Sequence, residues 1–288
     1  MNPVAYGIAL PAIRGVLAPP VAPPLDPMTG VTITGAWSVN RALLSSFAGQ
    51  DRLRMRDTSS GAIDDVATPA AALAFLNGNA GTVVSLYDHS GNARTLTNAA
   101  TALQLALVTG VGALSRAGAQ FDASDDFLQG AALSNFMSAV SGYVICAGLF
   151  AALTANNDVY LNQPLWRTST SGHGAYAKSG GSLYSYAFDN TFRCALGATV
   201  APAVPFVHEW WQASGQLYSR VNAGTTYQAV CGDTSVVISR LFGLGQDNGR
   251  AGAPGANGTI LEIATMSARP AQADALVADM MALYGIDD

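Results

Sequence analysis

Two short runs of acidic and small residues could bind an ion or a ligand through their side-chain oxygens. One is Tyr-Asp-His-Ser-Gly-Asn at 87–92, and the other is Phe-Asp-Ala-Ser-Asp-Asp-Phe-Leu at 121–128. In the second run, Asp122, Asp125 and Asp126 offer the hard oxygen ligands that Ca²⁺ takes at a turn. The alternative is that these carboxylates cap backbone N–H groups of the turn. The sequence indicates no other cofactor.

The run His-Glu-Trp-Trp-Gln at 208–212 begins like a zinc-binding helix but lacks the second histidine. Gln212 occupies the position where that motif requires it, so the zinc motif fails. If the run is a strand, Trp210 and Trp211 face opposite sides of it, and one can fill the core while the other is exposed. An exposed tryptophan could stack on a sugar ring. Packing against the N-terminal segment or a neighbouring subunit is the alternative.

Other reactive residue types are scattered along the chain. His89 and His173 lie in turns rich in glycine and serine, which predicts surface or hydrogen-bonding histidines. Cys146, Cys194 and Cys231 have neither disulfide nor zinc spacing and are expected to be buried thiols, which fits folding in a reducing cytoplasm. The sequence contains no Ser-His-Asp order, phosphate-binding Gly-Lys loop or dinucleotide fingerprint.

The composition limits the classes of partner. Half of the 288 residues are hydrophobic and 11% are charged, with a net charge of −5. The acidic balance argues against nucleic-acid binding, which needs a basic face. A surface so poor in charge favours burial against partner subunits or a coat of small polar residues. No run of 18 or more apolar residues predicts insertion into a membrane.

Residues 1–30 differ from the rest of the chain. Their prolines oppose helix and central-strand pairing and predict an extended, polyproline-like arm. The arm also carries many aliphatic side chains, which are costly to leave in water. We therefore expect it to anchor on a neighbouring subunit, with packing on its own domain as the alternative.

The remaining residues, 31–288, predict one all-β domain. Short apolar runs alternate with Gly, Asn, Ser and Asp turns, which is typical of a sandwich or barrel. Two helices are signalled by local chemistry. Thr68 and Pro69 start one that ends at Asn77–Gly78, and Gly285 ends another after Pro270. The second carries an apolar stripe that should pack on the sandwich: Leu276, Val277, Met280, Met281 and Tyr284.

Several segments resemble concanavalin A-like (laminin-G-like) jelly-roll proteins found among phage structural proteins. These segments are 36–43, 53–60, 86–93, 121–128, 258–263 and 282–286. Residues 42–49 and 87–99 are also similar to the catalytic domain of the α-L-arabinofuranosidase B family. The resemblance implies a concanavalin A-like jelly-roll β-sandwich with an extended N-terminal arm and a C-terminal helix.

The arabinofuranosidase resemblance implies one catalytic candidate and no partner for it. The turn at 245–249, Gly-Gln-Asp-Asn-Gly, matches the family's acid/base turn and points to Asp247, with Asn248 beside it. A retaining glycosidase needs two carboxylates about 5 Å apart. The stretch at 172–178, where the family places its glutamate nucleophile, has no carboxylate, and the chain contains only two glutamates, Glu209 and Glu262.

The sequence thus favours a structural surface protein of a phage or phage-like particle, such as a head spike, head fibre or tail decoration. It would be made in the bacterial cytoplasm, form homo-oligomers, and contact other virion proteins through residues 1–30. Its jelly roll could bind cell-surface polysaccharide through Trp210, Trp211, Asp247 and Asn248. The alternative is a glycoside hydrolase related to α-L-arabinofuranosidases that uses Asp247.

Overall fold

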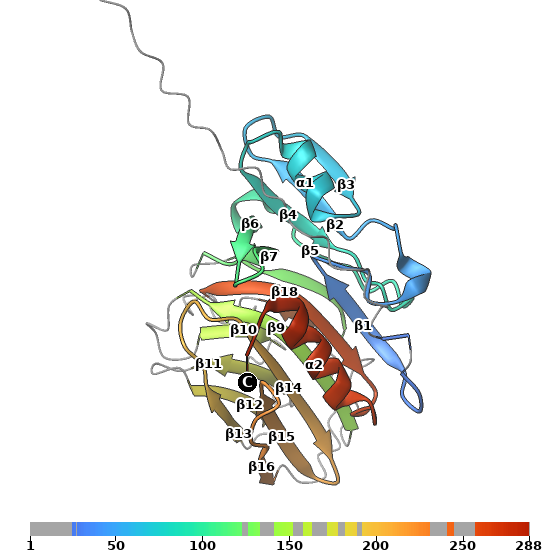
Figure 1. Ribbon diagram of the computed structural model, residues 1–288, viewed down its shortest axis with the longest axis vertical. Helices are drawn as coiled ribbons and strands as arrows, with labels where there is room; N and C mark the ends of the chain where they lie inside the picture. Colours follow the sequence, from blue (N-terminus) through green and yellow to red (C-terminus); the bar gives the residue numbers. More distant parts are fainter. Residues whose placement is uncertain are drawn as a thin grey trace, which may run out of the picture.

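The protein is an antiparallel β structure with two helices (Figure 1). This computed structural model describes residues 25–26, 28–122, 126–132, 141–151, 158–162, 172–177, 182–188, 192–230, 241–244 and 257–287. The all-β class expected from the sequence is confirmed. The strands are β1 Ile33–Ser38, β2 Leu53–Asp57, β3 Ile63–Val66, β4 Gly81–Leu86, β5 Leu96–Thr97, β6 Leu105–Val111, β7 Arg116–Gln120, β8 Leu128–Ala132, β9 Ser141–Phe150, β10 Asp158–Asn162, β11 Gly172–Ala177, β12 Ser182–Phe188, β13 Phe192–Thr199, β14 Phe206–Ala213, β15 Gln216–Val221, β16 Tyr227–Val230, β17 Leu241–Leu244 and β18 Gly258–Met266.

Strand β18 lies at the centre of one layer. It pairs with β9 along its whole length, and on its other side with β7 and then β1. Beyond β9 the layer continues through β14, β15 and β16. A second run of pairings joins β5, β8, β17, β10, β11, β12 and β13. Hydrogen bonds also link β4 to β2, β5 and β6, so the two runs form one continuous ladder.

Alternation along the strands divides the core into two clusters. In β9, Val144 and Cys146 point to the interior of the sandwich, while Tyr143 and Ile145 point to the other face. The inner cluster also holds Trp37, Phe121 and Trp210. The outer cluster lies between β9, β14, β18 and the C-terminal helix, which crosses these strands in Figure 1.

Both helices follow the predicted local chemistry. Helix α1 spans Pro69–Leu76; the Thr68 hydroxyl accepts a hydrogen bond from the N–H of Ala71, and Asn77 ends the helix in the left-handed conformation. Helix α2 spans Ala273–Tyr284, three residues later than the proline suggested, and Gly285 ends it with a φ of 64°. The predicted stripe of α2 is buried throughout. Among the described residues, no helix is long and apolar enough to cross a membrane.

The predicted arm at 1–30 lies mostly outside the described residues, so its role stays a prediction. Its end is described and packs on the chain's own body. Leu25 is 1% exposed, and its N–H donates to the Leu43 carbonyl at 3.1 Å. The Asp26 carboxylate accepts from the N–H of Ser45. The described end of the segment is therefore fixed to the domain that follows it.

Candidate functional site

The turn that follows β4 is organised by the Asp88 carboxylate. Its Oδ1 accepts from the N–H groups of Ala36 and Ser90, each at 2.9 Å. Its Oδ2 accepts from the Ser90 hydroxyl at 2.8 Å and from the N–H of Arg94 at 2.9 Å. Asp88 therefore ties the turn to β1. With four donors already bound, it acts as a structural acid.

His89 is the next residue and is buried, with 1% of its surface exposed. Its N–H donates to the Ala36 carbonyl at 2.7 Å, and its Nε2 lies 3.2 Å from the Asp51 carbonyl oxygen. A carbonyl oxygen only accepts, so Nε2 carries the ring hydrogen and Nδ1 is left as an acceptor. Nδ1 is buried and has no hydrogen-bond partner within the described ranges of the chain. Burial lowers the pKa of His89, and the charge of Arg52 adds to the decrease.

The ring of Phe47 covers one face of this histidine. The rings of Phe47 and His89 stack with centroids 5.3 Å apart and planes inclined by 12°. Phe47 ends the short helix η1 (Ser45–Phe47), so its ring comes from the connection between β1 and β2.

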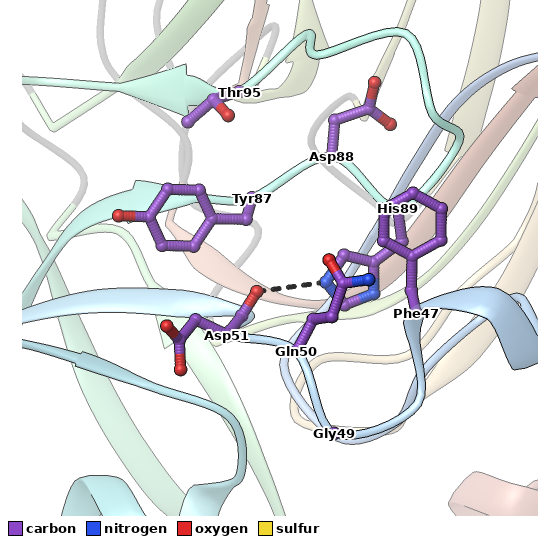
Figure 2. A pocket seen from close by; sticks show the side chains of 8 residues that line it. All are labelled: Phe47, Gly49, Gln50, Asp51, Tyr87, Asp88, His89 and Thr95. Carbon is purple, nitrogen blue, oxygen red and sulfur yellow. Dashed lines mark hydrogen bonds between the residues drawn. The ribbon is translucent and has the colours of Figure 1, made fainter.

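A pocket of about 410 Å³ opens beside the Phe47–His89 pair (Figure 2). Gly49, Gln50 and Asp51 line it from the segment before β2, while Tyr87 and Thr95 line it from the β4–β5 connection, together with Phe47, Asp88 and His89. Pockets of this size bind small ligands through apolar rings and a few polar groups. The pocket combines both kinds of surface.

The hydroxyl of Tyr87, on the rim of the pocket, is neutral and hydrogen-bonded. It donates to Asp65 Oδ1 at 2.7 Å. Burial and this carboxylate raise the pKa of Tyr87 to about 12. Tyr87 therefore offers a ring and a neutral phenol at physiological pH.

The sequence singled out 87–92 as a rim turn but missed the pocket. His89 forms a hydrogen bond, as expected, but it lies in the interior and not on the surface. Its burial depends on Phe47 and Asp51, which lie about 40 residues earlier in the chain. The aspartate that begins the Asp-His-Ser-Gly turn was the available signal, because such aspartates accept hydrogen bonds from the backbone that follows.

The two predicted sugar-stacking tryptophans lie on opposite sides of β14. Trp210 is 2% exposed in the inner cluster and stacks on His208 at 5.3 Å, so it offers no free face. Trp211 is partly buried on the outer side. It stacks on Tyr218 at 5.0 Å, and the Arg269 guanidinium lies 4.7 Å from its ring centroid. Neither ring lines the pocket, and their role in sugar binding stays a prediction.

Both glutamates of the chain are held in ion pairs beneath α2. Glu262 accepts two hydrogen bonds from Arg41, at 2.8 and 2.9 Å, and one from the Tyr284 hydroxyl at 3.0 Å. Glu209 accepts from Arg220, from Arg269 and, at 3.0 Å, from the Tyr143 hydroxyl. These two buried carboxylates are paired with arginines and hold elements of the sandwich and α2 together.

The remaining predicted site residues are only partly described. Asp125, Asp247 and Asn248 lie outside the described residues. Asp126 Oδ2 accepts from the N–H of Asp122 at 3.1 Å, which is a capping contact. Within the described ranges, no group of three or more His, Cys, Asp or Glu residues is placed to hold a metal ion. Calcium binding at Asp122, Asp125 and Asp126 stays a prediction.

Comparison with known proteins identifies the fold. No protein-family model and no curated protein matches the chain. A GH54 α-L-arabinofuranosidase mutant soaked with 4-nitrophenyl α-L-arabinofuranoside is similar, with a TM-score of 0.64 and 14% identity over 88% of this chain and 63% of that one. An arabinofuranosidase complexed with arabinofuranosyl-α-1,2-xylobiose has the same TM-score and coverage at 15% identity. The chain shares their fold.

A weaker likeness extends to Trypanosoma rangeli sialidase in complex with 2,3-difluoro-KDN. Its TM-score is 0.51 at 10% identity, over 71% of this chain and 32% of that one. At such identities the likeness concerns the fold alone, and this chain spans 63% of the length of the arabinofuranosidase chains. These neighbours are glycoside hydrolases. The resemblance to phage structural proteins stays a prediction.

Proposed function

We propose that this protein is a non-hydrolytic carbohydrate-binding β-sandwich, with the pocket beside Phe47 and His89 as its sugar site. The observation that carries the proposal is this pocket of about 410 Å³, where a stacked aromatic pair adjoins polar side chains. Sugars bind proteins through their apolar ring faces and their hydroxyl groups, which need both kinds of surface.

The charge of the pocket lining disfavours an anionic ligand. The hydrogen bonds of Asp88 are saturated, and Tyr87 is neutral because its pKa is raised to about 12. His89 is neutral at pH 7 because burial lowers its pKa. Asp51 is the exposed carboxylate of the lining.

The state of the two glutamates supports the non-hydrolytic part of the proposal. A retaining or inverting glycosidase needs two carboxyl groups that flank the scissile bond and can exchange protons. Glu209 and Glu262 are buried in arginine pairs beneath α2. Neither reaches the pocket lining.

A binding assay tests the proposal. The wild type is screened against an array of neutral and acidic glycans, and its best ligand is titrated by calorimetry into Phe47→Ala, Phe47→Trp and Leu73→Ala. Loss of the stacking ring should weaken binding at least tenfold, or about 1.4 kcal/mol, while the tryptophan should preserve it. Leu73 is exposed on α1 and does not line the pocket, so its variant is the control. The proposal would be refuted if Phe47→Ala bound as tightly as the wild type, or if no glycan on the array bound the wild type.

A hydrolase is the second candidate, favoured by the likeness to arabinofuranosidases. It would use Asp247. Incubation with 4-nitrophenyl α-L-arabinofuranoside distinguishes the two functions. Turnover by the wild type that disappears in Asp247→Asn would replace the binding function with catalysis.

We propose further that the sandwich is displayed on a phage or phage-like particle. Two features of the sequence support it: the apolar, proline-rich segment 1–30 and the low content of charged residues. The segment would contact other virion proteins and leave the pocket free to face a cell-surface glycan.

A further inference from the structure

The Nδ1 atom of His89 is a buried acceptor that receives no hydrogen bond from the described part of the chain. The contact between Nε2 and the Asp51 carbonyl fixes the tautomer, so Nδ1 holds a lone pair. No group among the residues that the structure describes donates to it. Buried polar atoms in folded proteins are nearly always hydrogen-bonded, and an exception calls for an explanation.

Gln50 and His89 both line the pocket. Figure 2 shows the Gln50 amide in front of the imidazole, between it and the viewer. Gln50 is exposed, and its amide nitrogen donates to the Ser46 carbonyl at 3.1 Å. Exposed side chains change rotamer within nanoseconds. A rotation of Gln50 can therefore change the lining of the pocket next to His89 without a movement of the backbone.

The surroundings favour an uncharged donor. The Arg52 guanidinium is buried, and its positive charge acts on the His89 ring. An ammonium group would lose its hydration next to this cation, which is unfavourable. A hydroxyl group can donate to Nδ1 without that cost.

We propose that His89 determines which sugar is bound: its Nδ1 accepts a hydrogen bond from one hydroxyl of a neutral sugar, and Gln50 gates the approach. The inference rests on the proposed function and names the atom that distinguishes one sugar from another. It predicts a preference for a neutral sugar with a correctly placed hydroxyl over its deoxy analogue.

Two substitutions of His89 separate its two nitrogens. Glutamine places its amide nitrogen near the position of Nε2, so His89→Gln retains a donor to Asp51 and loses the acceptor. Asparagine places its amide oxygen near the position of Nδ1, so His89→Asn retains the acceptor. We expect the affinity to fall at least tenfold in His89→Gln, to persist in His89→Asn, and to rise in Gln50→Ala. Thermal melts check that each variant is folded.

The probes are the methyl glycosides of L-arabinofuranose, D-galactose and D-glucose, with monodeoxy analogues of the one that binds. In the wild type, binding should shift the ¹⁵N signal of His89 Nδ1, and removing one particular hydroxyl should abolish that shift. If His89→Gln binds as the wild type does and the Nδ1 signal does not move, the inference is wrong, while binding that still depends on Phe47 leaves the proposed function intact. If no glycoside or array glycan binds the wild type, the proposed function itself fails.

Discussion

His208 shows how the interior of the sandwich sets the chemistry of a single residue. It is fully buried on the inner side of β14, and its Nε2 lies 3.0 Å from the Ser219 hydroxyl. Burial lowers the pKa of His208 to about 3. Its charged form is therefore compatible with the unfolded chain and not with the folded one.

This residue should make the stability of the protein depend on pH. The unfolded histidine binds a proton below about pH 6.5, while the folded one stays neutral down to about pH 3. Stability is therefore fully present above pH 6.5 and falls as the pH decreases toward 3, by at most about 1.4 kcal/mol per pH unit for one group.

Urea unfolding between pH 7.5 and 4 measures this dependence. In His208→Gln the amide can keep the bond to Ser219 but cannot titrate, so its stability should fall less steeply below pH 6.5 than that of the wild type. Some slope should remain, because the pKa of His89 is lowered as well. Identical slopes in the two proteins would contradict the prediction.

Individual side chains were predictable from the sequence where alternation decides their place. The opposite orientation of Trp210 and Trp211 follows from the two-residue period of a strand. The stacking partners of Trp211 do not, because Tyr218 and Arg269 come from β15 and the segment before α2. The Phe47–His89 pair could not be predicted for the same reason, because its two rings come from different segments of the chain.

At the scale of elements, α2 is attached to the sheet by two similar ion-pair networks. In each, an aspartate of the helix and a buried glutamate of a strand share arginines. Asp279 and Glu262 share Arg41, and Asp274 and Glu209 share Arg220 and Arg269. In each network a tyrosine hydroxyl also donates a hydrogen bond to the glutamate. The networks fix the helix over the apolar surface that its stripe covers.

We expect Glu262→Gln to destabilise the protein by about 3 kcal/mol, because it leaves the Arg41 guanidinium without its buried partner. The measurement is the free energy of unfolding in urea. Asp64→Asn removes an exposed carboxylate that forms no ion pair with another described residue, and should stay within about 0.5 kcal/mol of the wild type. Equal stabilities of Glu262→Gln and the wild type would show that the network contributes little.

The ends of the helices were readable in the sequence, but the layers of the sandwich were not. The Thr68 cap and the left-handed Asn77 and Gly285 are local devices. The pairing of β1 with β18 joins residues more than 220 positions apart, at Trp37 and Ile263 for example. Such pairings are chosen by the fit of whole faces, so the pattern of one strand cannot specify them.

At the scale of the whole molecule, the low charge and the apolar N-terminal segment raise the question of which surface of the protein contacts a partner. The body stays largely closed around its two apolar clusters, and its large exposed apolar side chains in the described ranges are single ones such as Leu114 and Val230. Scattered exposed side chains need no partner. The segment upstream of Leu25 is different, because its many aliphatic residues come with a single charge, Arg14, among its side chains.

We therefore predict that residues 1–24 drive self-association. The full chain should elute as an oligomer in size-exclusion chromatography with light scattering, and a chain that starts at Leu25 should be monomeric, because that cut preserves the buried Leu25 and its bond to Leu43. A full-length variant with serine at Ile8, Leu10, Ile13, Val16 and Leu17 separates apolar contact from length, and it should also be monomeric. Since burial of apolar surface is what would hold the copies together, the oligomer should persist in high salt. A full-length wild type that runs at 29.6 kDa would show that the segment does not join copies of this chain.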